Sequence, residues 1–160
     1  MIDAAVQNIR DGLPVQEDFK ARLGVAYDDW SASGGTTPAR FFDLMDEAIE
    51  FHSNLEREFP TDPLSGPFLG KAAVIRYWAA IAESWEMISS RTETIVGDGD
   101  RLVWIGRVRW RHRRTLRELE TPKVDVWTLW KGRAIRYFEM IDSLSYARAI
   151  GAVDPVAEQA

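Results

Sequence analysis

An acidic residue lies inside a stretch of sequence that otherwise predicts a buried β-strand. In "KVDVWTLWKGR", residues 123–133, the residues alternate in the pattern of a strand with one apolar face, and Asp125 occupies a position on that face. A buried carboxylate is costly unless it is paired with a cation, hydrogen-bonded or held neutral. Asp125 is therefore either structural, satisfied by Lys123, an arginine or backbone amides, or functional, kept neutral so that it donates a hydrogen bond.

A second acid, Glu139, lies on the next predicted strand, and its direction depends on the intervening turn. If residues 131–133 form a three-residue loop, Asp125 faces Glu139 and Trp127 faces Tyr137, whereas a two-residue loop turns Glu139 to the other face. We favour the three-residue loop, which makes Glu139 a second acid of the same pocket. Two adjacent carboxylates raise at least one pKa and titrate as a unit.

Histidine is the residue type best suited to proton transfer near neutral pH, and the chain has two. His52 ends a predicted strand, "AIEFHSN", where it could act as a base that removes a proton next to a carbonyl group. The alternative is a histidine hydrogen-bonded to backbone at a strand end. The chain has no cysteine and no glycine-rich phosphate loop after a strand, so neither a metal nor a cofactor is expected.

Composition and charge narrow the class of protein. A length of 160 residues fits one domain, and 46% hydrophobic with 28% charged residues is typical of a globular chain. A net charge of −5 weighs against nucleic acid or an anionic membrane as the main partner. The N-terminus does not resemble a signal peptide, and no apolar run reaches the ~18 residues of a membrane span. Together with the lack of cysteine, this favours the cytoplasm.

Two long helices are predicted from apolar residues spaced three and four apart. The first follows Pro14 and ends near Trp30, and the second covers residues 70–84. Between them, Thr37 is expected to cap a short helix whose first residue is Pro38. The apolar faces of the two long helices are formed by Phe19, Leu23, Ala26 and Trp30 in the first and by Ile75, Trp78, Ala79 and Ala82 in the second.

After Trp85 the hydrophobic period changes to two, which predicts four strands in a meander. Their ranges are about 85–96, 101–114, 118–130 and 134–142, and a last helix ends near Gly151. The order of elements predicts an α+β fold with helices on one face of a curved sheet. We expect a loose arm at 1–16, one domain at 17–151 and a tail at 152–160.

The turn at Thr115-Leu116 sets the register of the two central strands. If only these two residues turn, Gly106 faces Asp125, Trp104 faces Trp127 and Arg111 faces Glu120. Arginines of "RVRWRHRR", residues 107–114, then share one solvated face with glutamates, and an anion-binding surface is the weaker alternative. The opposite face carries Asp125 among aromatic side chains. Four of these aromatic residues would line a pocket for a flat apolar ligand: Trp78, Trp104, Trp127 and Tyr137.

The order and spacing of several segments resemble the nuclear transport factor 2-like superfamily, which includes ketosteroid isomerases, SnoaL-type polyketide cyclases and limonene epoxide hydrolases. The segments are "LMDEAIEFHSN", "GKAAVIRYWAAI", "GDGDRLVW" and "GRAIRYFEMIDSLSYARAI", and the resemblance covers roughly residues 17–150. It implies a cone-shaped α+β barrel, in which a curved antiparallel sheet wraps around N-terminal helices and encloses an apolar pocket. It also implies a homodimer.

The resemblance implies roles for particular residues. Tyr27 precedes Gly34 by seven residues, as the oxyanion-hole tyrosine of ketosteroid isomerases precedes a glycine. His52 falls where those enzymes have their carboxylate base, and Asp125 falls where they have a second oxyanion donor. The epoxide hydrolase pattern lacks its third-strand aspartate here, although Glu139 could be the acid of its last strand.

The sequence thus predicts a cofactor-free enzyme with His52, Asp125, Tyr27 and Glu139 as catalytic candidates. The expected chemistry is proton transfer on a hydrophobic ring compound, of the isomerase, cyclase or dehydratase type. The alternative is a non-catalytic ligand-binding or dimerisation domain of the same fold, because this fold serves both kinds of protein.

Overall fold

The computed structural model describes the backbone of residues 3–154 and the side chains of residues 15–154. In chain order the elements are α1 (Asp3–Ala32), α2 (Ala39–Leu44), β1 (Met45–Ser53), β2 (Phe68–Leu69), α3 (Lys71–Ser84), β3 (Trp85–Asp98), β4 (Arg101–His112), β5 (Glu118–Trp130), β6 (Arg133–Met140) and α4 (Ser143–Ile150). The α+β class is therefore confirmed. Within the described range no helix has the length and apolarity needed to cross a membrane.

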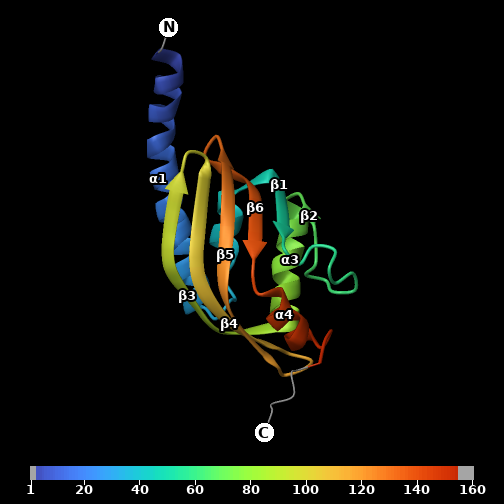
Figure 1. Cartoon of the computed structure of the whole chain (residues 1–160). Coiled ribbons are helices and arrows are strands. Elements are labelled where there is room, and N and C mark those ends of the chain that lie inside the picture. The colour runs from blue at the N-terminus through green and yellow to red at the C-terminus, as the bar shows by residue number, and fades with distance from the viewer. Residues whose placement is uncertain (1–2, 155–160) are drawn as a thin grey trace.

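A single curved sheet forms one layer of the molecule, and the helices form the other (Figure 1). The strand order is β2-β1-β6-β5-β4-β3, and β1 with β6 is the one parallel pair. Register shifts with extra residues in β1, β3 and β6 fit the curvature, because a β-bulge bends the strand that carries it. The sheet does not close into a barrel, since β2 and β3 remain its edges.

The helix α1 begins earlier than the sequence suggested. It runs from Asp3 through Pro14, in the segment expected to be a loose arm, and its N-terminal half extends beyond the sheet (Figure 1). Proline removes one backbone donor from a helix, and a helix of 30 residues accommodates the loss of that single bond. Residues 152–154 follow α4 as expected, whereas 1–2 and 155–160 lie outside the described residues.

Two predictions about the helices need correction. The apolar face of α3 is turned by one residue from the expected stripe: Val74, Tyr77 and Trp78 are buried, whereas Ile75 is 40% exposed. The cap of α2 is Pro38 without a side-chain hydrogen bond, because the Thr37 hydroxyl donates instead to a carbonyl of α1. The predicted apolar face of α1 is confirmed, since Phe19, Leu23, Ala26 and Trp30 are all buried.

The register of β4 against β5 is two residues away from the predicted one. The hairpin loop is longer than two residues, so Asp125 lies opposite Trp104, and Gly106 lies opposite Lys123. A shift of two leaves every side chain on its predicted face. The arginines and glutamates therefore remain together on the outer face, where Arg109 and Arg111 both form ion pairs with Glu118.

The predicted register of β5 against β6 is confirmed, but for a reason that the sequence did not reveal. The turn contains only Lys131 and Gly132, and a bulge at Ile135 of β6, opposite Thr128 and Leu129, adds the residue that the longer loop would have supplied. Asp125 therefore faces Glu139 across the two strands.

Gly106 provides space for a buried tryptophan. A Cβ atom at this position would overlap the indole of Trp104 and the carbonyl oxygen of Arg91. We expect Gly106→Ala to lower the free energy of unfolding by about 1–3 kcal/mol, because a clash with backbone is not relieved by rotating a side chain. The matched control is Gly24→Ala in α1, where the nearest atom is 3.9 Å away and a helical alanine should stabilise by roughly 0.5–1 kcal/mol. Urea denaturation measures both, and equal effects would contradict this packing.

Candidate functional site

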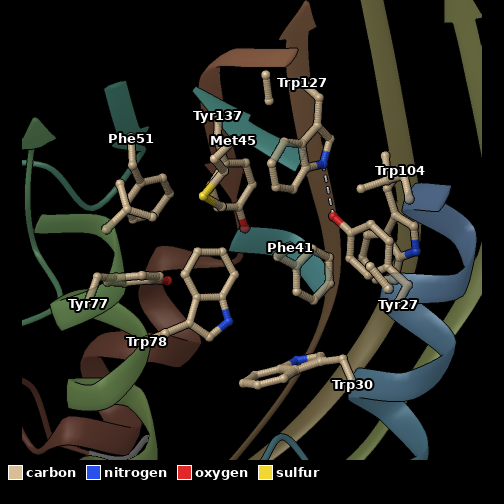
Figure 2. Close-up of a cluster of buried hydrophobic side chains, with 14 of the residues drawn as sticks. Tyr27, Trp30, Phe41, Met45, Phe51, Tyr77, Trp78, Trp104, Trp127 and Tyr137 are labelled. Atoms are coloured by element: carbon tan, nitrogen blue, oxygen red, sulfur yellow. Dashed lines mark hydrogen bonds between the residues drawn. The ribbon is translucent and has the colours of Figure 1, made fainter. Parts of the chain in front are cut away.

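A cavity lies between the sheet and the helices, and its wall is mostly aromatic (Figure 2). Its volume is about 90 Å³, and α1, α3, α4 and four strands of the sheet contribute to it. Two charged residues, Lys123 and Glu139, contribute to the wall. The aromatic residues of the wall are Tyr27, Trp30, Tyr77, Trp78, Trp85, Trp104, Trp110, Tyr137 and Tyr146.

Lys123 connects two carboxylates at this wall. Its Nζ atom lies 2.6 and 2.5 Å from the two oxygens of Asp125 and 2.9 Å from Oε2 of Glu139. Lys123 and Asp125 share a face because they are two residues apart on β5, and Glu139 lies opposite Asp125 on β6. All three side chains are at least 85% buried, so the ion pairs are only weakly screened by water.

Three tyrosine hydroxyls complete the coordination of the carboxylates. Tyr27 donates to Oδ2 of Asp125 at 2.6 Å, and Tyr77 donates to Oε1 of Glu139 at 3.0 Å. The hydroxyl oxygen of Tyr137 lies 3.1 Å from an oxygen of each acid, Oδ1 of Asp125 and Oε2 of Glu139. Because a phenol has one hydrogen, Tyr137 donates to one of the two acids at a time.

The protonation states follow from burial and charge. Burial, followed by the nearby carboxylates, holds the pKa values of Tyr27, Tyr77 and Tyr137 well above the usual range, so all three remain neutral phenols. Burial lowers the pKa of Lys123, but attraction by Asp125 and Glu139 outweighs it, and the net pKa is raised. Burial also raises the pKa of Asp125, opposed by Lys123 and reinforced by Glu139.

Asp125 and Trp127 lie behind the cavity wall rather than on it. Both are fully buried, and neither lines the cavity. The indole N–H of Trp127 donates to the Tyr27 hydroxyl at 3.1 Å (Figure 2). That hydroxyl in turn donates to Asp125. The only proton of Tyr27 is thus engaged, and the ring stacks on Trp104 with centroids 4.5 Å apart. Oδ2 of Asp125 therefore accepts from Tyr27, and the position of Asp125 behind the wall keeps it from direct contact with a ligand in the cavity.

His52 does not belong to this site. On β1 the residues Phe51 and Ser53 face the core, so His52, between them, points to the other face of the sheet. Its Nδ1 atom lies 2.7 Å from a carboxylate oxygen of Glu56, and Nε2 lies 3.5 Å from Glu50. The histidine base suggested by the resemblance is therefore absent from the cavity.

The structure thus brings together most, but not all, of the residues selected from sequence. Of those candidates, Tyr27, Trp78, Trp104, Tyr137 and Glu139 line the cavity. Lys123 was named from sequence only as a possible partner of Asp125, and Tyr77 was missed because the face of α3 was placed one residue away. The spacing of Lys123 and Asp125, two residues apart on one strand, was the signal for the ion pair.

The fold and the cavity place the chain in a known class of proteins. A family model described as the SnoaL-like domain matches residues 27–137. The chain therefore belongs to the SnoaL-like family, and it has the fold of nuclear transport factor 2-like proteins. A comparison with curated proteins finds no match.

Solved structures with low sequence identity share the fold. One is a nuclear transport factor 2-like protein of unknown function from Burkholderia pseudomallei, with 17% identity, a TM-score of 0.71, and coverage of 82% of this chain and 96% of that one. Another, from Rhodopseudomonas palustris, is provisionally assigned as an isomerase, with 16% identity, a TM-score of 0.67, and coverage of 84% and 97%. A third, from Jannaschia, is provisionally assigned as a SnoaL-like polyketide cyclase, with 16% identity, a TM-score of 0.65, and coverage of 86% and 94%.

The arrangement supplies the groups that proton transfer requires. Glu139 is a carboxylate that reaches the cavity, and Lys123 is a cation beside it that can stabilise negative charge on a ligand oxygen. Both groups lie in a mostly aromatic wall, where charges are screened less than in water, and this strengthens both interactions.

Proposed function

We propose that the protein is a cofactor-free enzyme that transfers a proton on a small, mainly apolar ring compound, as an isomerase, a cyclase or a dehydratase does. The observation that carries the proposal is the pair of opposite charges, Lys123 and Glu139, in the wall of an otherwise aromatic cavity. The provisional names of two proteins with this fold, an isomerase and a polyketide cyclase, agree with this class of reaction.

In this proposal Glu139 takes the role that the resemblance had given to His52. Its carboxylate removes a proton next to a carbonyl group and returns it elsewhere, while the ammonium group of Lys123 stabilises the negative oxygen that develops. Tyr77 and Tyr137 orient the carboxylate of Glu139 through hydrogen bonds of 3.0 and 3.1 Å. Asp125 holds Lys123 in place from behind the wall.

The cavity volume limits the substrate. A cavity of about 150 Å³ binds benzene, and this cavity measures about 90 Å³. A ring compound therefore enters only when lining side chains shift. Small ring compounds with one carbonyl or enol oxygen are accordingly the first substrates to test.

Hydrogen–deuterium exchange tests the proposal without knowledge of the full reaction. Cyclohexanone, cyclohexenone and tetralone are incubated with the protein in deuterated buffer, and deuterium next to the carbonyl group is followed by NMR. We expect saturable acceleration of exchange for at least one compound, because proton removal by Glu139 is the first step in every proposed reaction. Exchange at the buffer rate for compounds that bind in the cavity would contradict the proposal.

A non-catalytic ligand-binding domain is the second candidate, and one observation favours it. All four carboxylate oxygens of Asp125 and Glu139 already accept hydrogen bonds from lysine or tyrosine, so a reacting group has to compete with these partners. Binding without exchange in the assay above is the result this alternative expects. The homodimer and the absence of nucleic-acid or membrane partners stay predictions.

A further inference from the structure

We propose that Asp125 and Glu139 share a single proton at neutral pH, and that Tyr137 passes this proton between them. Asp125, which does not touch the cavity, would then serve as the proton store for Glu139, which does. The inference deepens the proposed function and rests on it for its catalytic meaning, although the shared proton is measurable without any substrate.

The first support is the balance of buried charge. The site contains one buried cation, Lys123, and two buried acids, Asp125 and Glu139. If both acids were ionised, the cluster would carry an uncompensated negative charge in surroundings that stabilise charge poorly. One proton on the pair makes the cluster neutral. The other ionisable groups near the pair, Tyr27 of α1, Tyr77 of α3 and Tyr146 of α4, are phenols whose pKa values are raised mainly by burial, so they supply no compensating charge.

The second support is the position of the Tyr137 hydroxyl. It lies 3.1 Å from Oδ1 of Asp125 and 3.1 Å from Oε2 of Glu139, so it hydrogen-bonds equally well to either acid. In the transfer, the Oδ1–H proton of Asp125 moves to the phenol oxygen while the proton of the phenol moves to Oε2 of Glu139. The phenol is neutral before and after, Asp125 becomes the carboxylate, and Glu139 becomes the acid.

The third support is the alignment of the strands. Asp125 and Glu139 are directly opposed on β5 and β6, and Tyr137 lies two residues before Glu139 on the same face. The bulge at Ile135 of β6, opposite Thr128 and Leu129, is what sets this register. Like charges on directly opposed residues disfavour ionisation of both acids at once.

Infrared spectroscopy of the protein without ligand tests the shared proton. A protonated carboxylic acid has a carbonyl stretching band that a carboxylate lacks, and ordinary exposed acids lose it well below neutral pH. We expect wild-type protein at pH 7 to show this band, and Asp125→Asn and Glu139→Gln each to lose it, because the remaining acid then ionises beside Lys123. Glu120→Gln, on the outer face of β5, is the control and should retain the band.

Two spectroscopic results would overturn the shared proton: no band at pH 7 in the wild type, or a band that survives in both Asp125→Asn and Glu139→Gln.

The relay is tested separately with Tyr137→Phe, which keeps both acids. In that variant we expect the band to remain while kcat for exchange falls roughly a hundredfold at similar KM. An unchanged kcat would overturn the relay.

Failure of this inference and failure of the proposed function give different results. Catalysed exchange by a protein that lacks the infrared band would support the enzyme proposal and contradict the inference of a shared proton. An infrared band in a protein that catalyses no exchange would support the shared proton and contradict the enzyme proposal.

Discussion

Lys123→Met lowers the free energy of unfolding at pH 8 by about 3–5 kcal/mol, because removal of one partner leaves buried charge uncompensated. Lys123 is the cation that contacts both Asp125 and Glu139, and its side chain is 15% exposed. Methionine retains the length and apolar stem of lysine, so the loss reports on charge more than on packing. Denaturation in urea at several pH values measures it.

The loss of stability in Lys123→Met depends on pH in a defined direction. Burial already raises the folded-state pKa of Asp125, and without Lys123 its main opposing interaction is gone, so the folded variant binds more protons than the unfolded chain. The stability of the variant relative to wild type is therefore lowest above the raised pKa of Asp125 and recovers as the pH falls through it. A loss of stability that grows as the pH falls would contradict the assignment of Lys123 as the cation that compensates the buried acids.

Two further variants isolate the charge effect of Lys123. Lys71→Met removes a lysine whose acidic partner, Glu47, is 88% exposed, and should cost less than about 1 kcal/mol. Adding Asp125→Asn to Lys123→Met should restore part of the lost stability, because one uncompensated carboxylate is removed. A double variant less stable than Lys123→Met would show that Asp125 is needed for reasons other than its charge.

Glu139→Gln reduces kcat for proton exchange by about 10²–10⁴-fold, the usual contribution of a general acid or base. Glutamine has the shape of glutamate but lacks a basic oxygen of comparable strength. Because the Lys123–Asp125 pair remains balanced in charge, the free energy of unfolding should change by only about 1 kcal/mol. Exchange kinetics and thermal unfolding of the same preparations measure both quantities.

Glu120→Gln is the matched control for this effect, since Glu120 is exposed on the outer face of the sheet. It should retain full kcat. Full turnover by Glu139→Gln would show that Glu139 is not the base of the reaction, and the ligand-binding alternative would then explain the cavity better.

Much of the fold was predictable because hydrophobic period reports on burial. The change from helical spacing to alternation after Trp85 placed all four meander strands to within two residues at each end, and the predicted buried face of α1 was correct. The parallel pairing of β1 with β6 was not predictable, since β1 carries no local signal for which strand it joins.

The site was predictable where it depended on alternation and unpredictable where it depended on turns. Asp125, Trp104 and Tyr137 lie on the expected face because a shift of two residues preserves alternation. Glu139 faces the core only because a bulge compensates for a short turn, and bulges leave little trace in a single sequence. The resemblance aligned His52 with a catalytic position, whereas alternation along β1 directs its side chain away from the core.

A crystal structure of the protein with phenol tests the central claim most directly, because phenol is a ring with one acidic oxygen and few other ways to bind. The account predicts phenol in the aromatic cavity, with its oxygen about 3 Å from Nζ of Lys123 or a carboxylate oxygen of Glu139. Phenol bound elsewhere on the surface, with the cavity closed around an intact Lys123–Asp125–Glu139 cluster, would contradict the claim that this cluster is a ligand site.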